Sequence, residues 1–449
     1  MDDLRGKRLV ILGLARQGQA LARFAAEVGA QVVVSDLRSP QQLAGIMQQL
    51  ADLEIEYVLG EHPMSLLEKA DVLAISGGVP ADAPLVQEAE RRGVLVTNDS
   101  QEFVRRAPAD VIGITGSAGK TTTTALTGVM GMTAGRRTWV GGNIGRPLIA
   151  DLHKMAAEDM VVQELSSFQL EIWNQSPHVA AVLNITPNHL DRHKTMAAYA
   201  GAKSNILRHQ SADDVAVLCA DDPGSMALSL LAKGRLRLFS LRREVADGAF
   251  VRDGQVWLRN GHETAVLPIS EIPLPGQHNV LNVLAAVTLA DSVGIAPEAM
   301  AQAVRSFQGV EHRLERVAVV NGVQFINDSI ATAPERVLAA LASFSQPLVL
   351  LAGGKDKDMV WDEWTRRVTA QVKHVVLFGA LAEMLAERLT AVHYTHFTRV
   401  ETLAEAVDVA VETAVPNDIV LLSPGGTSFD AFPDFAARGE AFREMVRQL

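Results

Sequence analysis

One pattern recurs along the chain and restricts its fold: a short apolar run rich in β-branched residues, then glycine or serine, then a helix-like segment. It occurs as RLVILGLARQG, QVVVSDLRS and DVLAISGGVP, then as DVIGITGSAGKT, and later as PLVLLAGGKDK, HVVLFGA and DIVLLSPGGTS. Short strands that alternate with helices are typical of parallel α/β layers. In such sheets ligands bind at the carboxyl ends of the strands, where these glycines lie.

The chain divides into three sections. Its 449 residues exceed what one hydrophobic core usually supports. We expect boundaries at residues 1–97, 98–308 and 309–449, and the stretch DGAFVRDGQVWLRNGHETAVLP predicts hairpins at one edge of the second section. No internal repeat or long linker separates the sections.

Composition excludes several classes of protein. The net charge of −11 predicts no general affinity for nucleic acid or for an anionic membrane. The single cysteine, Cys219, excludes an intramolecular disulfide framework and a cysteine-rich zinc site. No apolar run reaches the roughly 18 residues that a membrane span needs. We therefore expect a cytoplasmic protein without membrane insertion, and a monomer because three sections can bury one another's faces.

The segment GITGSAGKT, residues 113–121, has the composition of a phosphate-binding loop. Its spacing departs from the usual motif, because five residues rather than four separate Gly113 from the Gly119-Lys120 pair. Small residues still allow successive N–H groups to face one anion, and the following helix and Lys120 add positive charge. The hydroxyl of Thr121 would reach a magnesium ion between two phosphates. The sequence predicts a nucleoside triphosphate site.

Three polar clusters follow later strands. GGNIGRP contains Asn143 and Arg146, VVQELSSFQLE contains Glu164, and VLNITPNHLDRH contains His189, Asp191 and His193. A carboxylate such as Glu164 is a ligand for a hard cation, and His189 could be a second ligand or a base. Because each cluster comes at the carboxyl end of a strand, we expect all three to converge on the bound phosphate.

The first section allows a different function. GLARQG is one glycine short of the dinucleotide fingerprint, and Asp36 follows it at a suitable distance. Taken alone, this stretch favours a nicotinamide-dependent oxidoreductase. That hypothesis leaves the loop at Lys120 and the clusters of Glu164 and His189 unexplained.

A set of motifs in one order covers nearly the whole chain: GSAGKTTT, GGNIG, ELSSFQLE, LNITPNHLDRH, YAGAKSNI, GQHNVLN, EHRLE, NDSIATAPE and SPGGTS. This set resembles the Mur ligase family, whose loops of the type TGTNGKT share the unusual spacing. The resemblance implies a Rossmann-like N-terminal domain, a central P-loop-type ATPase domain with a mostly parallel sheet, and a Rossmann-like C-terminal domain. It also implies an ATP-dependent carboxylate–amine ligase that adds D-glutamate to UDP-N-acetylmuramoyl-L-alanine through an acyl phosphate, in cytoplasmic peptidoglycan precursor synthesis.

The resemblance also implies roles for individual residues around ATP and two Mg²⁺ ions. The implied catalytic residues are Lys120, Asn143, Glu164, His189 and Lys203, with Lys203 carried as a carbamate. The implied metal ligands are Thr121, Glu164, His189 and Lys203. The implied ATP-binding residues are Gly116, Ser117, Ala118, Gly119, Lys120, Thr121, Thr122, Asn279, Asn282, Arg313 and Asp328. Asn279 is also placed to cap a helix.

The resemblance also implies contact residues for the other two substrates. The implied UDP-sugar contacts are Leu14, Ala15, Asp36, Arg38, Ser76, Gly77 and Gly78, in place of a nicotinamide cofactor. The implied amino-acid contacts are Thr332, Lys357, Ser428 and Phe435, with Lys355 competing for the role of Lys357. A lysine and two hydroxyls suit a dicarboxylate such as glutamate.

The chain departs from the family pattern at three places. Ala118 replaces an asparagine of the loop, Ile330 replaces the lysine of NDSKAT, and Gly425, Gly426 and Thr427 replace the usual SPACAS residues. The last two changes lie in the implied amino-acid pocket, and they leave L-glutamate or another amino acid open as the acceptor. Two further hypotheses are a non-catalytic nucleotide-binding module and a folylpolyglutamate-type ligase. The presence of His189 and Lys203 weighs against the first, and the late position of the phosphate loop against the second.

Overall fold

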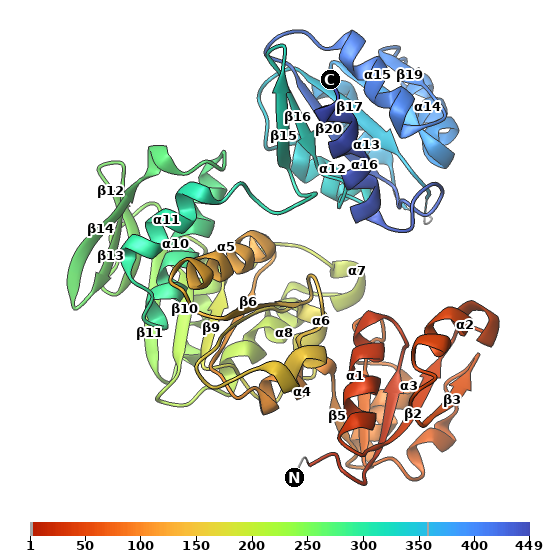
Figure 1. Cartoon of the computed structure of the whole chain (residues 1–449), viewed down its shortest axis with the longest axis vertical. Coiled ribbons are helices and arrows are strands. Elements are labelled where there is room, and N and C mark those ends of the chain that lie inside the picture. The colour runs from red at the N-terminus through yellow and green to blue at the C-terminus, as the bar shows by residue number, and fades with distance from the viewer. Residues whose placement is uncertain (1–2, 357–358) are drawn as a thin grey trace. The chain divides into compact units, whose positions relative to one another are not determined.

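The computed structural model describes residues 3–356 and 359–449, without the side chain of Asp191, and these residues form three β-sheets (Figure 1). Contacts group the chain into two compact units, Met1–Phe307 and Gln308–Leu449, and the first unit contains two of the sheets. The mostly parallel α/β architecture predicted from the sequence is confirmed. The exact section boundaries at 97/98 and 308/309 stay a prediction.

The first sheet is entirely parallel, in the order β3-β2-β1-β4-β5. Its strands are β1 (Arg8–Leu12), β2 (Gln31–Asp36), β3 (Ile55–Leu59), β4 (Val72–Ile75) and β5 (Leu95–Thr97), and its helices are α1 (Arg16–Glu27), α2 (Pro40–Gln49), α3 (Pro84–Arg91) and α4 (Asp99–Arg106). Apolar residues of α1, α2 and α4 pack on one face and those of α3 on the other. This layering buries both faces, which is why the strands read as continuous apolar runs.

The second sheet has nine strands in the order β14-β13-β12-β11-β10-β9-β6-β8-β7. These are β6 (Val111–Thr115), β7 (Thr138–Gly142), β8 (Met160–Glu164), β9 (Val179–Val182), β10 (Val215–Cys219), β11 (Arg235–Ser240), β12 (Gly248–Arg252), β13 (Gln255–Asn260) and β14 (His262–Pro268). Pairing is parallel from β7 to β12 and antiparallel across β12, β13 and β14, as the hairpin-like sequence of this region predicts. β6 pairs in parallel with β8 on one side and β9 on the other, so its carboxyl end lies between theirs.

Helices cover this second sheet and carry several candidate site residues. They are α5 (Lys120–Thr133), α6 (Ser167–Leu170), α7 (Leu190–His193), α8 (Met196–Arg208), α9 (Pro223–Met226), α10 (Gln277–Ser292) and α11 (Pro297–Ser306). Apolar residues of α8 pack with β9 and β10, while α5, α10 and α11 pack against one another. Short 3₁₀ helices occur in all three parts of the chain, at Met64–Leu67 beside the first sheet, at Leu148–Lys154, Ala227–Leu231 and Ile269–Glu271 beside the second, and at Gly379–Leu381 beside the third.

The third sheet belongs to the second unit and has the order β15-β16-β20-β17-β18-β19, with only the β15–β16 pair antiparallel. Its elements are β15 (Glu315–Val320), β16 (Val323–Asn327), α12 (Pro334–Leu341), β17 (Leu348–Gly353), α13 (Asp362–Gln371), β18 (His374–Phe378), α14 (Ala382–Ala391), β19 (Phe397–Arg399), α15 (Leu403–Thr413), β20 (Ile419–Gly425) and α16 (Phe435–Arg447). Helices α12, α13 and α14 cover one face, and α15 and α16 the other.

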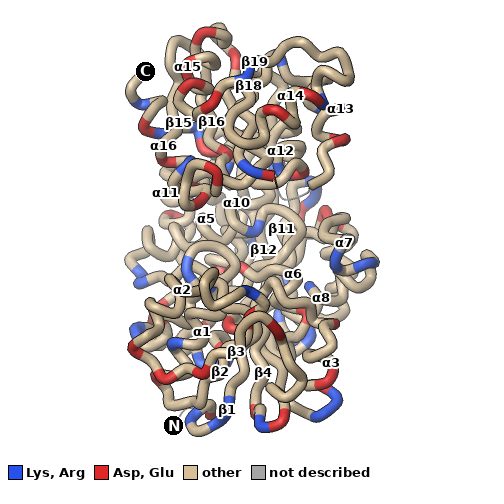
Figure 2. The backbone as a smooth tube through the Cα atoms, turned by 90° about the vertical axis from the view of Figure 1, so that its right-hand side faces the viewer, with Lys and Arg blue, Asp and Glu red and all other residues tan. Residues whose placement is uncertain are grey.

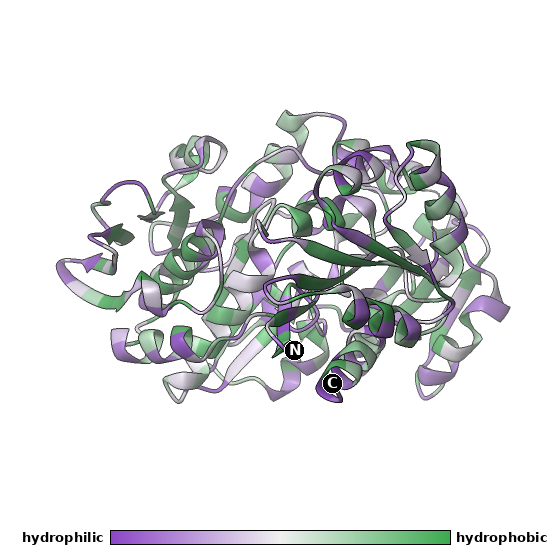
Figure 3. Ribbon diagram, turned by 90° about the horizontal axis from the view of Figure 1, so that it is seen from above, coloured by the Kyte–Doolittle hydropathy of each residue, from purple (hydrophilic) through white to green (hydrophobic). Residues whose placement is uncertain are grey.

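Hydropathy and charge follow this layering. The strands are predominantly hydrophobic in Figure 3, in keeping with their burial between helices. Figure 2 shows lysine, arginine, aspartate and glutamate interspersed along the backbone of both units. Among the described residues, no helix is long and apolar enough to cross a membrane.

A buried ion network fixes β11 of the second sheet to α10. The guanidinium of Arg237 is fully buried, and its Nε and Nη2 lie 2.8 Å from Asp247 and 2.6 Å from Asp291. Nη1 also donates to the carbonyl oxygen of Thr288 at 3.2 Å. Arg235, two residues earlier, contacts the same Asp247 at 2.6 Å, but its side chain is 44% exposed.

The two arginines make a matched test of this network. Arg237→Ala should lower the free energy of unfolding by about 3–5 kcal/mol, because two carboxylates lose a buried partner. Arg235→Ala should cost less than about 1 kcal/mol, because water screens an exposed ion pair. Urea unfolding followed by circular dichroism measures both. Equal losses in the two variants would show that the buried network does not stabilise the sheet.

Candidate active site

The predicted phosphate loop lies at the carboxyl end of β6, an interior strand that pairs with β8 and β9. Residues 116–119 leave the strand, and α5 begins at Lys120. Gly119 precedes the helix with a φ of +82°, and a Cβ at this position would collide with Oδ1 of Asn282. Glycine is required here because it adopts this positive φ without strain and has no Cβ to collide with Asn282. The first N–H groups of α5 therefore face the loop, which is the geometry of an anion site.

Two lysines converge on this loop. The ammonium nitrogens of Lys120 and Lys203 donate to the same carbonyl oxygen, that of Gly116, at 2.8 and 2.9 Å. Lys203 is 1% exposed and also donates to Oγ1 of Thr115 at 3.2 Å. Burial, and then the charge of Lys120, lower the pKa of Lys203 to about 6, against an opposing effect of Glu164. The cation of Lys120, with the buried amine of Lys203 at the same carbonyl, makes a site that favours an anion.

The carboxylate of Glu164 joins two other predicted residues at the end of β8. Its Oε2 accepts from the hydroxyl of Thr121 at 2.8 Å, and its Oε1 accepts from the amide of Asn143 at 2.8 Å. Gly142 lies so close to Glu164 that a Cβ would collide with the backbone of Glu164. Carboxylate and hydroxyl oxygens at the start of α5 are the donor types that Mg²⁺ prefers, so the pair of Thr121 and Glu164 fits one magnesium ion.

Loop residues 116–118 are held by side chains that the sequence motifs did not identify. Oδ1 of Asn184 accepts from the backbone N–H of Ala118 at 2.8 Å, and its Nδ2 donates to the carbonyl of Ala118 at 3.1 Å. The hydroxyl of Tyr199 donates to Oγ of Ser117 at 2.9 Å. Asn184 thus secures the loop through its backbone, where the side chain of Ala118 has no polar group to contribute.

His189 precedes α7 in a left-handed conformation with a φ of +53°. Its ring is exposed and meets the ring of Phe168 edge-on, with centroids 4.9 Å apart. His193, from the same cluster, is buried and contacts Oγ of Ser167 at 2.9 Å. Arg146 pairs instead with Asp151 at 3.2 Å. A role for His189 as a ligand of a second metal ion stays a prediction, and no three His, Cys, Asp or Glu side chains of the described chain form a metal-binding group.

Asn279 and Asn282 lie on the first turns of α10, beside the phosphate loop. Nδ2 of Asn282 donates to Oδ1 of Asn279 at 3.1 Å, and Nδ2 of Asn279 donates to the carbonyl of Pro275 at 2.7 Å. Asn279 is half-buried, whereas Asn282 is 8% exposed and lies against Gly119. The structure therefore brings this pair to the loop. Thr122 lies in the first turn of α5.

The predicted UDP-sugar residues gather at the carboxyl ends of β1, β2 and β4. Oδ2 of Asp36 accepts from the N–H of Leu14 at 2.7 Å, and both its oxygens accept from Arg38 at 2.8 and 2.9 Å. Burial opposes the charge of Asp36, but the hydrogen bonds from Arg38 and Leu14 outweigh it and lower its pKa to about 2. Asp36 is therefore ionised and holds the turn that contains Ala15 in place.

The segment 76–79 closes the same edge of the first sheet. The hydroxyl of Ser76 donates to the carbonyl of Gly13 at 2.8 Å, and the N–H of Gly77 contacts Oε1 of Gln17 at 3.4 Å. A Cβ on Gly78 would have no other atom within 4 Å, so the space beside this residue is open. These contacts join the turn after β1 to the turn after β4, two of the turns that carry the predicted UDP-sugar residues.

In the second unit, Asp328 is buried at the end of β16. Its Oδ1 accepts from the N–H of Leu314 at 3.2 Å, and its Oδ2 accepts from the hydroxyl of Ser423 at 2.9 Å. Burial raises its pKa to about 7, against the hydrogen bond from Ser423 and the charge of Arg313. The turn that contains Arg313 has positive φ at His312 and at Leu314, which are costly conformations for these residues.

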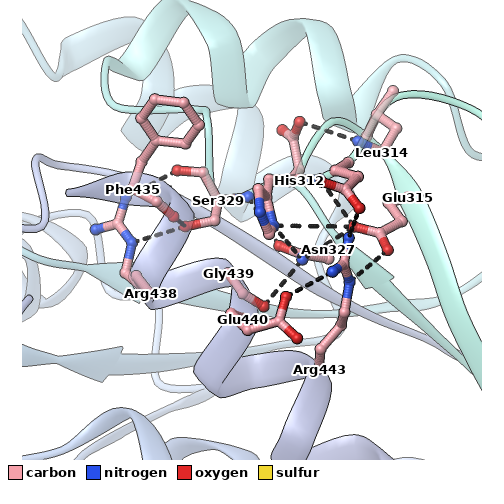
Figure 4. A network of polar contacts seen from close by, with 12 residues as sticks. His312, Leu314, Glu315, Asn327, Ser329, Phe435, Arg438, Gly439, Glu440 and Arg443 are labelled. Carbon is pink, nitrogen blue, oxygen red and sulfur yellow. Dashed lines mark hydrogen bonds and ion pairs between the residues drawn. The ribbon is translucent and has the colours of Figure 1, made fainter. Parts of the chain in front are cut away.

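A polar network holds this costly turn in place (Figure 4). The amide of Asn327 donates to Nδ1 of His312 at 3.0 Å and to the carbonyl of Gly439 in α16 at 3.1 Å. Arg443, also of α16, contacts Glu315 at 2.7 Å. The network connects β15, β16 and α16, so it fixes the backbone on both sides of Arg313.

The predicted amino-acid residues lie in loops of the same unit. Thr332 follows β16, Ser428 is 2% exposed and follows β20, and Phe435 begins α16. The fully buried Arg438 joins these loops, because it donates to the carbonyls of Ser329 and Gly426 at 2.9 and 3.1 Å. Lys357 lies outside the described residues.

Family models match three consecutive parts of the chain. They are the Mur ligase MurD-like N-terminal domain at residues 7–98, the Mur ligase middle domain at 114–290, and the Mur ligase glutamate ligase domain at 312–426. Together these matches cover most of the chain and include all three sheets.

Curated relatives match over the full length. The UDP-N-acetylmuramoylalanine–D-glutamate ligase of Symbiobacterium thermophilum is 42% identical, with 99% of this chain and 98% of the relative covered. The enzyme of the same name from Pelotomaculum thermopropionicum is 40% identical, with coverages of 100% and 99%. Among solved structures, MurF of Acinetobacter baumannii is similar at a TM-score of 0.58 and 20% identity over 95% of this chain and 87% of that one. MurF of Thermotoga maritima in complex with ADP is similar at 0.55 and 17% identity, with coverages of 100% and 99%.

Two glycines with similar φ angles test the close packing at the loop. Gly119→Ala should lower the free energy of unfolding more than Gly135→Ala, by about 1–3 kcal/mol, because it adds a steric collision with Asn282 to a similar backbone strain. Gly135 has a φ of +76° and open space where a Cβ would lie. Urea unfolding of both variants measures the difference. Equal effects would mean that Asn282 does not pack against the loop.

Proposed function

The chain belongs to the Mur ligase family, and we propose that it adds D-glutamate to UDP-N-acetylmuramoyl-L-alanine with consumption of ATP. Such a reaction converts the substrate carboxylate into an acyl phosphate, which the amine of glutamate then attacks to form the peptide bond. The family relationship replaces the hypothesis of a nicotinamide-dependent oxidoreductase. Relatives about 40% identical over the full length that are named for D-glutamate favour this amino acid as the acceptor, despite Ile330 and the loop at Gly425.

The observation that carries the proposal is the pair of lysines on the carbonyl of Gly116, at the start of α5. A carboxylate is a poor acyl donor until one of its oxygens carries phosphate, and phosphoryl transfer is mainly a matter of position and charge. We assign Lys120 and the first N–H groups of α5 to the β- and γ-phosphates. Asn143, which is hydrogen-bonded to Glu164, is assigned to orient the transferred group.

Thr121 and Glu164 are the residues that would hold magnesium beside these phosphates. The ion would neutralise phosphate charge and orient the phosphate oxygens. Asn279 and Asn282 are assigned to the adenine, and Arg313 and Asp328 to an ATP phosphate and the ribose. The UDP group is assigned to the turns that contain Leu14, Asp36 and Ser76, and glutamate to Thr332, Lys357, Ser428 and Phe435.

We further assign Lys203 as the site of a carbamate. Its amine is buried next to Lys120, an environment that favours the neutral amine, and addition of CO₂ to that amine with release of a proton would place an anion beside the cation of Lys120. The resulting oxygens and His189 are assigned to a second magnesium ion. The enzyme is proposed to act in the cytoplasm as a monomer, which size-exclusion chromatography with light scattering would test.

Carbamylation of Lys203 predicts a labelled carbonyl signal in carbon NMR of the full-length protein in ¹³C-bicarbonate. The signal should disappear in Lys203→Ala and persist in Lys154→Ala, a lysine of the same unit that pairs with Asp151 at 2.8 Å. A signal of equal size in Lys203→Ala, or none in the wild type, would contradict the assignment.

The reaction itself is tested by phosphate release from ATP with UDP-N-acetylmuramoyl-L-alanine and separate amino acids. We expect release with D-glutamate and none with L-glutamate. Lys120→Ala and Glu164→Ala should each reduce the rate by about 10²-fold or more while the fold persists, because both groups are assigned to the transferred phosphate and its magnesium ion. Lys154→Ala is the control and should keep the rate.

Each outcome has a distinct meaning. Wild-type rates in both Lys120→Ala and Glu164→Ala would overturn the site. Release with L-glutamate or another amino acid would show that the changes at Ile330 and Gly425 reset specificity. No release with any amino acid would leave the family intact and the proposed substrate wrong.

A further inference from the structure

Arg192 connects the turn after His189 to the segment 77–79 of the first sheet. Its Nη1 donates to the carbonyl oxygen of Gly77 and its Nη2 to that of Val79, both at 2.9 Å. The guanidinium therefore spans two carbonyls with its two parallel amino groups. Neither the motif HLDRH nor the phosphate loop explains these contacts, which join elements 113 and more residues apart.

The guanidinium also lies on an aromatic side chain. Its central carbon is 4.2 Å from the ring centroid of Phe168, and the same ring contacts His189 edge-on. Nη2 lies 3.7 Å from Oε2 of Glu171, whose Oε1 is 3.1 Å from Nδ1 of His193. Arg192 is thus fixed by a ring and a carboxylate on its own domain and makes its hydrogen bonds to the other.

The contacts continue to the phosphate loop. Phe168 stacks on His193 with centroids 5.3 Å apart, and His193 meets the ring of Tyr199 at 5.1 Å. The hydroxyl of Tyr199 donates to Oγ of Ser117. An unbroken series of packed side chains therefore extends from the segment 77–79 to the loop at Ser117.

We propose that Arg192 is a positioning residue that holds the segment 77–79 in register with the turn of His189. A sugar nucleotide bound at this segment would then present its carboxylate to the phosphate loop. The inference rests on the proposed function, because it takes residues 76–78 as part of the UDP-sugar site. Arg192 itself acts through the two backbone carbonyls and need not touch the substrate.

Arginine is required at this position for a geometric reason. A planar guanidinium offers several donors in a fixed fork, so one side chain can satisfy both carbonyls while its face lies on Phe168. A lysine ammonium is a point charge that lacks this fork and this flat face. Arg192→Lys should therefore keep the positive charge but no longer hold the segment 77–79 in place relative to the turn of His189. This variant separates positioning from simple electrostatic attraction.

The test compares Arg192→Lys and Arg192→Ala with Arg208→Ala in the full-length protein. Arg208, on α8, makes hydrogen bonds of 3.2 and 3.0 Å to Asn205 and Ser204 and serves as the matched control. Phosphate release gives kcat and the separate KM values for ATP and for UDP-N-acetylmuramoyl-L-alanine. Both Arg192 variants should raise KM for the sugar nucleotide by about tenfold or more and lower kcat, because charge-assisted hydrogen bonds are lost. KM for ATP should stay within about twofold, and Arg208→Ala should match the wild type.

The outcomes separate the inference from the proposed function. Wild-type constants in Arg192→Lys and Arg192→Ala would overturn the positioning role and leave the proposed function standing. An equal rise in both KM values would also overturn it, because that result indicates a general structural loss. If Arg192→Ala does not fold, Arg192→Lys decides. A wild-type protein that does not use the sugar nucleotide would refute the proposed function instead.

Discussion

The carbonyl oxygen of Gly116 is the point on which the central site depends. It lies at the end of β6, which pairs with β8 and β9, and accepts hydrogen bonds from the side-chain nitrogens of both Lys120 and Lys203. Because α5 begins directly after this loop, Lys120 and the helix N-terminus give positive charge to one small region. Glu164, in the parallel strand beside β6, balances that charge through Thr121. An anionic ligand with a bound cation is the chemistry that such an arrangement favours.

Burial determines the charge of several candidate residues. Lys203 and Asp328 are almost completely buried. Loss of water lowers the pKa of Lys203 and raises that of Asp328, so in each case burial favours the neutral form. Asp36 is also buried, yet the hydrogen bonds that its carboxylate accepts from Arg38 and Leu14 keep it ionised. Hydrogen-bond partners, rather than depth alone, therefore decide whether a buried carboxylate stays charged. The net charge of −11 describes none of these local environments.

Much of the fold and part of the site could be predicted from local sequence. The strand-glycine pattern predicted the parallel sheets, and the hairpin-like stretch predicted the antiparallel edge of the second sheet, since both depend on neighbouring residues. The convergence of Thr121, Asn143 and Glu164 also followed, because parallel strands end at a common edge. Asn184, Tyr199 and Arg192 were not identified as parts of the site. Each acts through a partner far away in the sequence, and no short motif indicates such a contact.

The sequence by itself determined the α/β class and the family and predicted the phosphate loop, because strand patterns, glycine positions and ordered motifs are properties of the linear chain. Only the tertiary structure decided that Lys120 and Lys203 share one carbonyl, that Asn184 secures Ala118, and that Arg192 bridges to the segment 77–79. The physical reason is that hydrogen-bond geometry and loss of water arise only when distant segments pack together. The charge of Lys203 depends on that packing.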